Sequence, residues 1–309
     1  EPRLQKLIKE DSRVKKLMQQ EGDVGLVAEQ LLKKKPITLI PLGKLTVKEL
    51  FEKLHLIVET SGTGSQDKKT NILVTLLQKS PAKGAKYISR IALGTLRMGV
   101  AEMTVLDALA IAYTGEKSNK VHLEQAYNIC PDVGIIAETM AKDGLAGLAK
   151  IRISVGRPIK MMLAQRVSEL EDVSKKIPGK LGVEGKYDGE RVQAHKDKSG
   201  KITLFSRRLE NNTEQFPDLV KYLEKQIKAK EFIVEAEVLA VNEKGEHQPF
   251  QVLMQRRRKH DVEEYVKKIP VMAKVFDVLY LDGKVVMNEP FEKRMDLLKK
   301  IVKRSKHVT

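Results

Sequence analysis

The chain has 309 residues, of which 41% are hydrophobic and 32% are charged, so its composition supports a buried core and excludes an intrinsically disordered protein. No apolar run approaches the roughly 18 residues of a membrane-spanning helix, and the single cysteine, Cys130, excludes an intrachain disulfide framework and a cysteine-rich zinc module. The net charge of +16 favours a polyanionic partner, most simply nucleic acid, although a heat-adapted protein with a charge-rich surface would share it.

Helical spacing of apolar residues dominates the first half of the chain. Leucine, isoleucine and valine recur at intervals of three and four residues within 4–18 and 50–58, and strand-like alternation is scarce. Residues 101–112 are apolar over much of the surface of the helix that they would form, which predicts a buried helix. We therefore expect an all-α domain over residues 1–150.

The pattern changes near Ile151. Residues 152–160 contain a glycine and a proline and are typical of an extended linker. Beyond them, short β-rich runs alternate with helical stretches, which predicts an α+β domain over residues 151–309. The pair Asp188-Gly189 is a strong hairpin signal between the first two runs. The predicted strands cover 181–187, 191–195, 202–206, 232–241 and 271–281, and the predicted helices cover 216–229 and 291–302.

A lysine, a carboxylate and an arginine gather around this predicted turn. In strand geometry Glu184 and Lys186 point to the same side, and Arg191 returns to their neighbourhood after the turn. An amine attacks only in its neutral form, which partial burial and a neighbouring cation favour. The pattern therefore indicates a lysine nucleophile that faces a phosphate, although an ordinary ion pair on a surface strand fits these residues equally well.

Four motifs follow one another in the order typical of a known family. The first, Lys-x-Asp-Gly-x-Arg at 186–191, resembles that of the covalent nucleotidyltransferases, which comprise ATP-dependent DNA ligases, RNA ligases and mRNA capping enzymes. The other three resemble the DNA-ligase versions, closest to the archaeal and eukaryotic replicative type. Two loops in the first half resemble loops of the helical DNA-binding domain of those ligases. These three motifs lie at 205–211, 233–238 and 275–283, and the two loops at 62–69 and 96–102.

The resemblance implies a multi-domain ATP-dependent DNA ligase, with an all-α DNA-binding domain followed by an α+β covalent-nucleotidyltransferase (adenylation) domain. It implies that Lys186 forms a lysyl-AMP adduct with ATP, with Mg²⁺ assistance, before nicked duplex DNA is sealed. Glu237 would bind the ribose or the metal ion, although Glu235 shares its strand face and the choice between them stays open. The other implied nucleotide contacts are Glu184 to the adenine side, Arg191 to the ribose and phosphates, Arg207 to the phosphates, and Phe276 stacked on adenine.

Phe276 and a further motif residue, Asp188, each have two possible interpretations. On a regular strand Phe276 shares a face with Met272 and Val278, which is typical of an ordinary core. Asp188 is either a member of the site or a turn residue only.

The densest basic cluster lies at residues 256–260. A run of charge is usually a solvated face, but within this resemblance phosphate contact is the better interpretation. Such contacts would hold a duplex without reading its sequence. The DNA-binding candidates are Arg256, Arg257 and Arg258 in the cluster, and Lys68, Lys69 and Arg97 in the first half.

Some features that the resemblance implies do not occur in the chain. The fourth and fifth nucleotidyltransferase motifs and an oligonucleotide-binding β-barrel would follow the adenylation motifs, and the helical domain would begin several helices earlier. We therefore expect an internal piece of a longer ligase, with a clipped helical domain and a truncated adenylation domain.

The resemblance also implies a cellular setting. Such a ligase acts in DNA replication, repair and recombination, in the cytoplasm beside an archaeal nucleoid or in a eukaryotic nucleus. A sliding clamp is a further partner to consider, and no membrane partner is expected. One alternative is another covalent nucleotidyltransferase, an RNA ligase or a capping enzyme, although those usually lack the helical module. The other is a DNA-binding piece without ligation activity.

Overall fold

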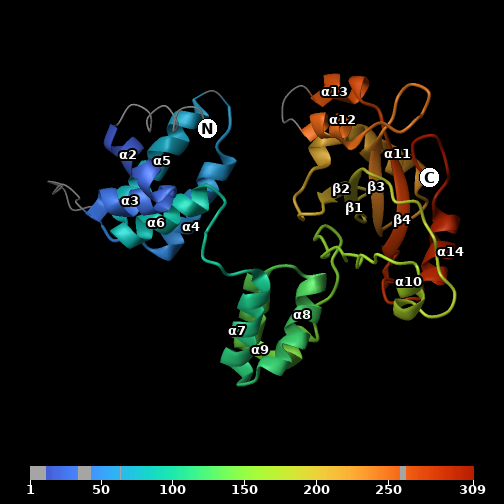
Figure 1. The fold of residues 1–309 in the computed structure, drawn as a ribbon, viewed down its shortest axis with the longest axis horizontal. Helices are drawn as coiled ribbons and strands as arrows, with labels where there is room; N and C mark the ends of the chain where they lie inside the picture. The colour runs from blue at the N-terminus through green and yellow to red at the C-terminus, as the bar shows by residue number, and fades with distance from the viewer. Residues whose placement is uncertain (1–11, 34–42, 63, 258–261) are drawn as a thin grey trace. The chain divides into compact units, whose positions relative to one another are not determined.

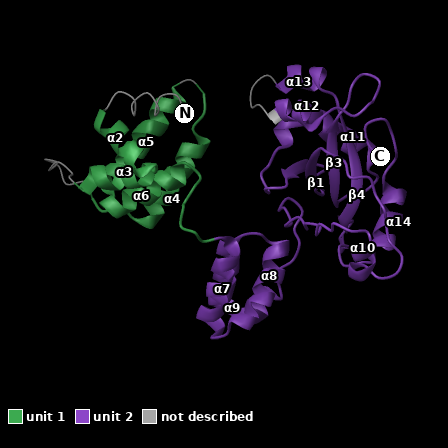
Figure 2. Cartoon of the chain, in the orientation of Figure 1, with its two compact units in different colours: residues 1–100 green, residues 101–309 purple. Residues whose placement is uncertain are grey.

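The computed structural model describes residues 12–33, 43–62, 64–257 and 262–309, without the side chain of Arg257. The chain forms two compact units, residues 1–100 and residues 101–309, which Figure 2 colours separately. The predicted domain boundary at residue 150 rests on the change from helices to strands. This change falls inside the second unit, because helices also precede the sheet of that unit (Figure 1).

The described residues of the first unit form helices and no strands. Helices α3 (Val24–Lys33) and α6 (Ala82–Ala92) pack closely because Gly25 has no side chain, and a Cβ there would lie 2.7 Å from the carbonyl oxygen of Lys86. Beside this contact the buried carboxylate of Asp23 pairs with Arg90, with 3.2 Å between Oδ1 and Nε. The helices are α2 (Ser12–Glu21), α3 (Val24–Lys33), α4 (Val47–Glu59), α5 (Ser65–Lys79) and α6 (Ala82–Ala92).

Three helices begin the second unit. Gly115, in the left-handed region with a φ of 76°, ends the first of them. Leu106 and Ala110 are buried against the other two helices, but Ile111 is 50% exposed. The prediction of a buried helix is therefore correct for one face only, because its neighbours pack against one side. The elements are α7 (Glu102–Thr114), the 3₁₀ turn η1 (Lys117–Asn119), α8 (Lys120–Ile129) and α9 (Val133–Leu148).

A five-stranded antiparallel sheet follows, in the order β2-β1-β3-β4-β5. Its four longer strands and two longer helices lie where the alternation and the helical periods of the sequence predict them, which confirms the α+β class. The strands are β1 (Glu190–Lys196), β2 (Ile202–Ser206), β3 (Phe232–Ala240), β4 (Val271–Leu281) and β5 (Lys284–Val285). The helices are α10 (Glu171–Lys176), η2 (Thr213–Gln215), α11 (Pro217–Gln226), α12 (Phe250–Met254), η3 (Gln255–Arg257), α13 (Val262–Lys268) and α14 (Phe291–Ile301).

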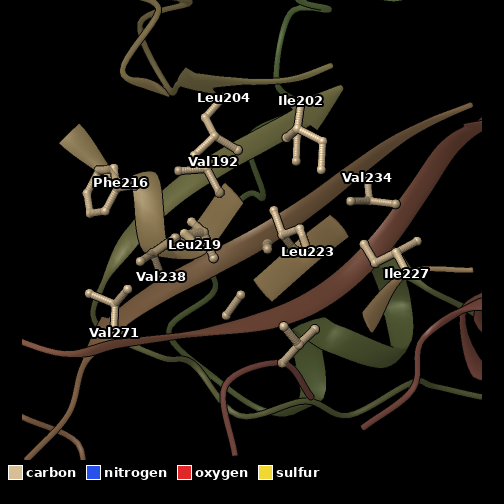
Figure 3. Close-up of a cluster of buried hydrophobic side chains, with 14 of the residues drawn as sticks. Val192, Ile202, Leu204, Phe216, Leu219, Leu223, Ile227, Val234, Val238 and Val271 are labelled. Atoms are coloured by element: carbon tan, nitrogen blue, oxygen red, sulfur yellow. The ribbon is translucent and has the colours of Figure 1, made fainter. Parts of the chain in front are cut away.

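One face of the sheet carries the main hydrophobic core (Figure 3). Val192 of β1 and Val234 and Val238 of β3 are fully buried there beneath Leu219 and Leu223 of α11. Each such side chain contributes about 1.5–3 kcal/mol of burial free energy. Because side chains alternate along a strand, the residues between these valines lie on the opposite face, where the polar groups described below are gathered.

The hairpin predicted at Asp188-Gly189 is wrong. Residues 177–189 form no strand, and the hairpin joins β1 to β2 instead, through a turn that begins at Asp197. Gly189 is needed for a close approach between backbones, because a Cβ there would lie 2.2 Å from the carbonyl oxygen of Val238 on β3. Gly189 is therefore a packing feature of the sheet.

The linker crosses the face of the sheet opposite the main core. Ile159 is 2% exposed and packs against Ile233 of β3 and Leu279 of β4. The next residue, Lys160, donates its backbone N–H to the carbonyl oxygen of Asn128 at 2.8 Å, which ties the linker to α8 as well. The segment between the helices and the strands is therefore packed into the second unit.

Buried polar side chains of β1 hold this linker. Gln193 accepts a hydrogen bond from the Ile159 N–H at 2.7 Å and donates one to the Ile159 carbonyl oxygen at 3.2 Å. His195 Nδ1 accepts from the Gly156 N–H at 3.1 Å, and its Nε2 lies 2.9 Å from Gln193 Oε1. This pattern fits the neutral ring with its proton on Nε2. Burial lowers the pKa of His195 to about 4, which agrees with that state.

Arg256 supports the fold from inside. It is 2% exposed, and its guanidinium forms a two-point ion pair with Asp218 of α11, with N–O distances of 2.6 and 2.9 Å. Two backbone carbonyl oxygens accept its further hydrogen bonds. The structure thus contradicts the predicted DNA contact of Arg256, because its terminal nitrogens are buried and already bound. Arg258 lies outside the described residues, and the side chain of Arg257 is not described.

The close approach at Gly189 predicts that Gly189→Ala destabilises the second unit. The added methyl group forces the backbone away from Val238, at a cost of about 1–3 kcal/mol, and thermal unfolding followed by circular dichroism measures the destabilisation. Gly185→Ala is the matched control, since the atoms nearest to its Cβ belong to the Tyr187 side chain and lie at 3.4 Å or more. Equal melting temperatures for the two variants would contradict the close approach.

The buried His195 predicts a loss of stability in mild acid. The unfolded imidazole, with a pKa near 6.5, takes up a proton that the folded protein excludes down to about pH 4. Protonation therefore favours unfolding, and the free energy of unfolding falls by up to about 3 kcal/mol between those pH values. Denaturant titration across that range, with His195→Gln as the non-titrating control, measures this contribution. Parallel curves for the two proteins would show that His195 does not cause the fall in stability.

Candidate active site

Arg191 is fixed on the sheet face opposite the main core. Its Nη2 pairs with the carboxylate of Glu235 on β3, and its Nη1 donates to the carbonyl oxygen of Met162 at 2.8 Å. The guanidinium carbon lies 5.2 Å from the centre of the Phe276 ring. The Nε–H is buried and has no partner among the described residues, so this guanidinium retains an unused donor.

Glu237 lies opposite Arg191 in the register of β1 and β3. Its Oε1 accepts a hydrogen bond from the Gly189 N–H at 3.1 Å. Burial raises the pKa of the Glu237 carboxyl, although that hydrogen bond and the positive charges of Lys186 and Arg191 act to lower it, and the charge of Asp188 raises it. These interactions bring the lysine, the arginine and the two carboxylates into one electrostatic group.

Lys186 lies on the irregular segment that precedes β1. Its side chain is exposed, and its Nζ donates a hydrogen bond to the Tyr187 carbonyl oxygen at 2.7 Å. No backbone–backbone hydrogen bond joins residues 178–188 to another part of the described chain. The strand geometry expected for Glu184 and Lys186 is therefore wrong, and Lys186 reaches the site from a loop.

Aromatic contacts hold this loop on both sides of Lys186. Upstream, Gly182 lies against Phe291 of α14, where a Cβ would come within 2.7 Å of a ring carbon. Downstream, Tyr187 packs on a small apolar cluster of β3 and β4, and Lys274 Nζ lies 5.4 Å from the centre of its ring. The lysine is thus carried between two anchored points.

Phe276 reaches the site because β4 is irregular. Glu235 pairs with Asp277, but the next residue of β3 pairs with Val275, so Phe276 is the extra residue of a β-bulge. Val278 is buried in the main core, whereas the Phe276 ring faces Arg191. The prediction that Phe276 and Val278 share a face is wrong, because the bulge shifts the alternation.

Two predicted nucleotide contacts are exposed and form no bond to this group in the described part of the chain. Glu184 is exposed on the loop, and Arg207 is exposed in the turn after β2. Neither side chain forms a hydrogen bond or ion pair to the group in the described part of the chain. The structure brings together Lys186, Arg191, Glu237 and Phe276.

Few carboxylates are available here for a metal ion. Among the described residues no group of three or more His, Cys, Asp or Glu side chains could hold one. Glu237 and Asp188 are two carboxylates whose charges interact at the site. Mg²⁺ usually binds one or two protein carboxylates together with substrate phosphates. The donor set therefore fits a Mg²⁺ ion that arrives with a nucleotide.

The DNA-binding candidates of the first unit lie on its surface. Lys68, which is exposed, and Lys69, which is half-buried, lie near the start of α5. Arg97 has a positive φ of 48°, and its side chain is 59% exposed, although Nη1 lies 3.2 Å from the Asp23 carboxylate. All three remain accessible to a phosphate.

Sequence reasoning missed residues that support the site. Gln193 and His195 alternate with Val192 and Ala194, and this period of two predicts one polar and one apolar face of the strand. That signal was present in the sequence, but it does not reveal that the polar face lies beneath a linker. No local pattern marks Tyr187 as the anchor of the loop.

Two family models match the chain. The model described as DNA ligase N terminus matches residues 3–110, and the model described as ATP dependent DNA ligase domain matches residues 161–309. The second match contains the whole electrostatic group and Phe276.

Similar proteins include archaeal and bacterial ligases. "DNA ligase 2" of Thermofilum pendens is 46% identical over 94% of this chain and 49% of its own length. "Probable DNA ligase" of Aquifex aeolicus is 41% identical over 96% of this chain and 50% of its own length. Among solved structures, the ligase domain of M. tuberculosis LigD is 26% identical, covers 38% of this chain and 34% of that chain, and has a TM-score of 0.30.

The chain spans about half the length of the curated relatives that it matches. The two family matches lie in the order helical part, then sheet-containing part, and together they cover most of the sequence. On this evidence the chain belongs to the ATP-dependent DNA ligase family.

Proposed function

We propose that this chain performs the adenylation step of an ATP-dependent DNA ligase, in which Lys186 accepts AMP from ATP. The observation that carries the proposal is that Glu237 lies opposite Arg191 and within reach of the Lys186 charge, while the Arg191 guanidinium lies over the ring of Phe276. An exposed amine near a carboxylate and a fixed cation, with an aromatic face against that cation, suits attack on the phosphate of a bound adenine nucleotide.

In this step Lys186 Nζ attacks the α-phosphorus of ATP. A P–N bond forms while the P–O bond to pyrophosphate breaks, and the amine gives up its protons to solvent. Arg191 is held by Glu235 and Met162, so it offsets the phosphate charge without reorienting. Mg²⁺, when bound, supplies further positive charge to the phosphates.

The remaining contacts follow from the motifs and from the site geometry. Phe276 offers its ring face to the adenine, and Glu237 binds the ribose or the metal ion. Glu235 is committed to Arg191 and Gln193, which favours Glu237 between the two carboxylates. Glu184 is proposed for the adenine side and Arg207 for the phosphates on their motif positions alone.

For the whole ligase we propose nick sealing. AMP passes from the lysine to the 5′-phosphate at the nick, and the 3′-hydroxyl then attacks that phosphate and releases AMP. The names of the relatives and the net charge of +16 support duplex DNA as the substrate. These relatives are archaeal and bacterial proteins, which favours action beside a nucleoid over a eukaryotic nucleus. A sliding clamp as partner stays a proposal on the resemblance alone.

Proposed DNA contacts lie mainly in the helical unit. Lys68, Lys69 and Arg97 are accessible there, and Arg257 and Arg258 complete the set on the sequence alone. Contacts of this kind bind the phosphate backbone and hold the duplex without selecting a sequence.

Adenylation is tested directly with α-labelled ATP and Mg²⁺. We expect covalent label on the purified chain that survives denaturation, and none on Lys186→Ala, which lacks the attacking amine. Lys180→Ala removes an exposed lysine from the same loop and keeps the label. Label on Lys186→Ala would overturn the assignment of the nucleophile, and an unlabelled wild-type chain would count against adenylation by this chain.

Phosphate contact predicts a change in the salt dependence of DNA binding. Replacing Lys68 and Lys69 by alanine should weaken binding equally for unrelated duplexes, and the slope of log affinity against log salt should fall by about 0.9 for each phosphate that the variant no longer neutralises. The control replaces Lys299 and Lys300, an exposed pair on α14. Fluorescence anisotropy at several salt concentrations measures both slopes. An unchanged slope for the first variant would show that Lys68 and Lys69 are solvated surface residues that do not contact DNA phosphates.

A further inference from the structure

Three alternate side chains of β1 bind the linker at regular intervals. Arg191 bonds to the carbonyl oxygen of Met162, Gln193 to both backbone groups of Ile159, and His195 to the N–H of Gly156. The linker therefore runs antiparallel to β1 across its polar face, with every third linker residue held by every second strand residue. The proposed nucleotide site and the linker share one row of side chains.

Gln193 is the centre of this row, and its amide is saturated. Its Oε1 accepts from the Ile159 N–H and from His195 Nε2, at 2.7 and 2.9 Å. Its Nε2 donates to the Ile159 carbonyl oxygen and to Glu235 Oε1, both at 3.2 Å. An amide has two donor and two acceptor positions, so no bonding capacity is left over. Gln193 has no exposed surface, and Glu235 is 3% exposed.

The saturated amide is connected to both anchors of Arg191. Glu235 divides its carboxylate between Gln193 on Oε1 and Arg191 on Oε2. The second anchor of Arg191 is Met162, three residues along the linker from the residue that Gln193 clamps. Both supports of the guanidinium thus pass through Gln193, one by way of Glu235 and one by way of the linker backbone.

We propose that Gln193 is a positioning residue for Arg191, and that through it the linker forms part of the nucleotide site. The expected effect of Gln193 on activity rests on the proposed adenylation. The position of the Arg191 side chain can be measured without ATP. Loss of the Gln193 amide leaves Ile159 and Glu235 with unpaired buried groups and frees the guanidinium to turn.

The first measurement is hydrogen exchange by NMR on the whole chain, with the Arg191 Nε–H signal identified by its absence in Arg191→Lys. In Gln193→Met, which keeps the side-chain length and removes the amide, exchange at Arg191 Nε and at the amides of Ile159 and Gly156 should rise by about tenfold or more. The Lys160 amide is an internal control, because it bonds to Asn128 outside the row. Gln193→Asn is a milder change. The same exchange rates are compared in this variant if Gln193→Met does not fold.

Asp218→Asn is the matched control for lower stability. It weakens another buried pair, with Arg256, on the helix that covers the opposite face of the sheet. We expect it to lower the melting temperature without changing exchange at Arg191. Unchanged exchange at Arg191 Nε in both Gln193 variants overturns the proposal, and so does an equal increase in Asp218→Asn.

The second measurement is the ATP dependence of lysyl-AMP formation per folded molecule. The Gln193 variants should need a several-fold higher ATP concentration for half-maximal labelling, and Asp218→Asn should match the wild type. An unchanged ATP dependence in Gln193 variants that do label contradicts the proposal. A wild-type chain without label contradicts the proposed function instead, and the exchange measurement still decides this inference.

Discussion

Arg191 on β1 and Glu235 on β3 are opposite charges that meet between the sheet and the linker, with the carboxylate almost entirely out of water. They are diagonal neighbours in the strand register, since Arg191 itself faces Glu237. A buried charge left unpaired costs about 3–5 kcal/mol, so this pair strongly favours the observed register and the observed path of the linker. This ion pair lies at the centre of the site. Around it are the loop that carries Lys186, the β-bulge with Phe276, and Glu237.

The irregularity of β4 determines which aromatic side chain enters the site. A regular strand would turn Phe276 toward the core that holds Val278, and the sheet would then present no ring beside Arg191. The extra residue has no partner on β3, and its hydrophobic side chain lies on the polar face of the sheet. At this position the Phe276 ring makes a cation–π contact with the Arg191 guanidinium and adds an apolar surface to the polar face.

Strands and long helices could be predicted from the sequence because burial on one face repeats with a period of two or near four. The site could be predicted only where a motif names its residues, as at Lys186 and Arg191. Contacts between distant segments were beyond reach. Asp188-Gly189 has the composition of a turn, yet its glycine serves a contact with β3 some fifty residues away along the chain. Arg256 belongs to a basic run, yet it is buried in an ion pair with Asp218. Nothing in the run itself distinguishes this buried arginine from a solvated one.

The loop that carries Lys186 has aromatic anchors at Gly182 and Tyr187 and no backbone hydrogen bonds between them. A segment fastened only at its ends moves without disturbing the sheet, because it shares no ladder with a strand. Arg191, by contrast, is clamped from two directions. The two cations therefore differ in mobility. Lys186 lies on a loop that can move together with a group bound to its amine, whereas Arg191 keeps a fixed position on the sheet.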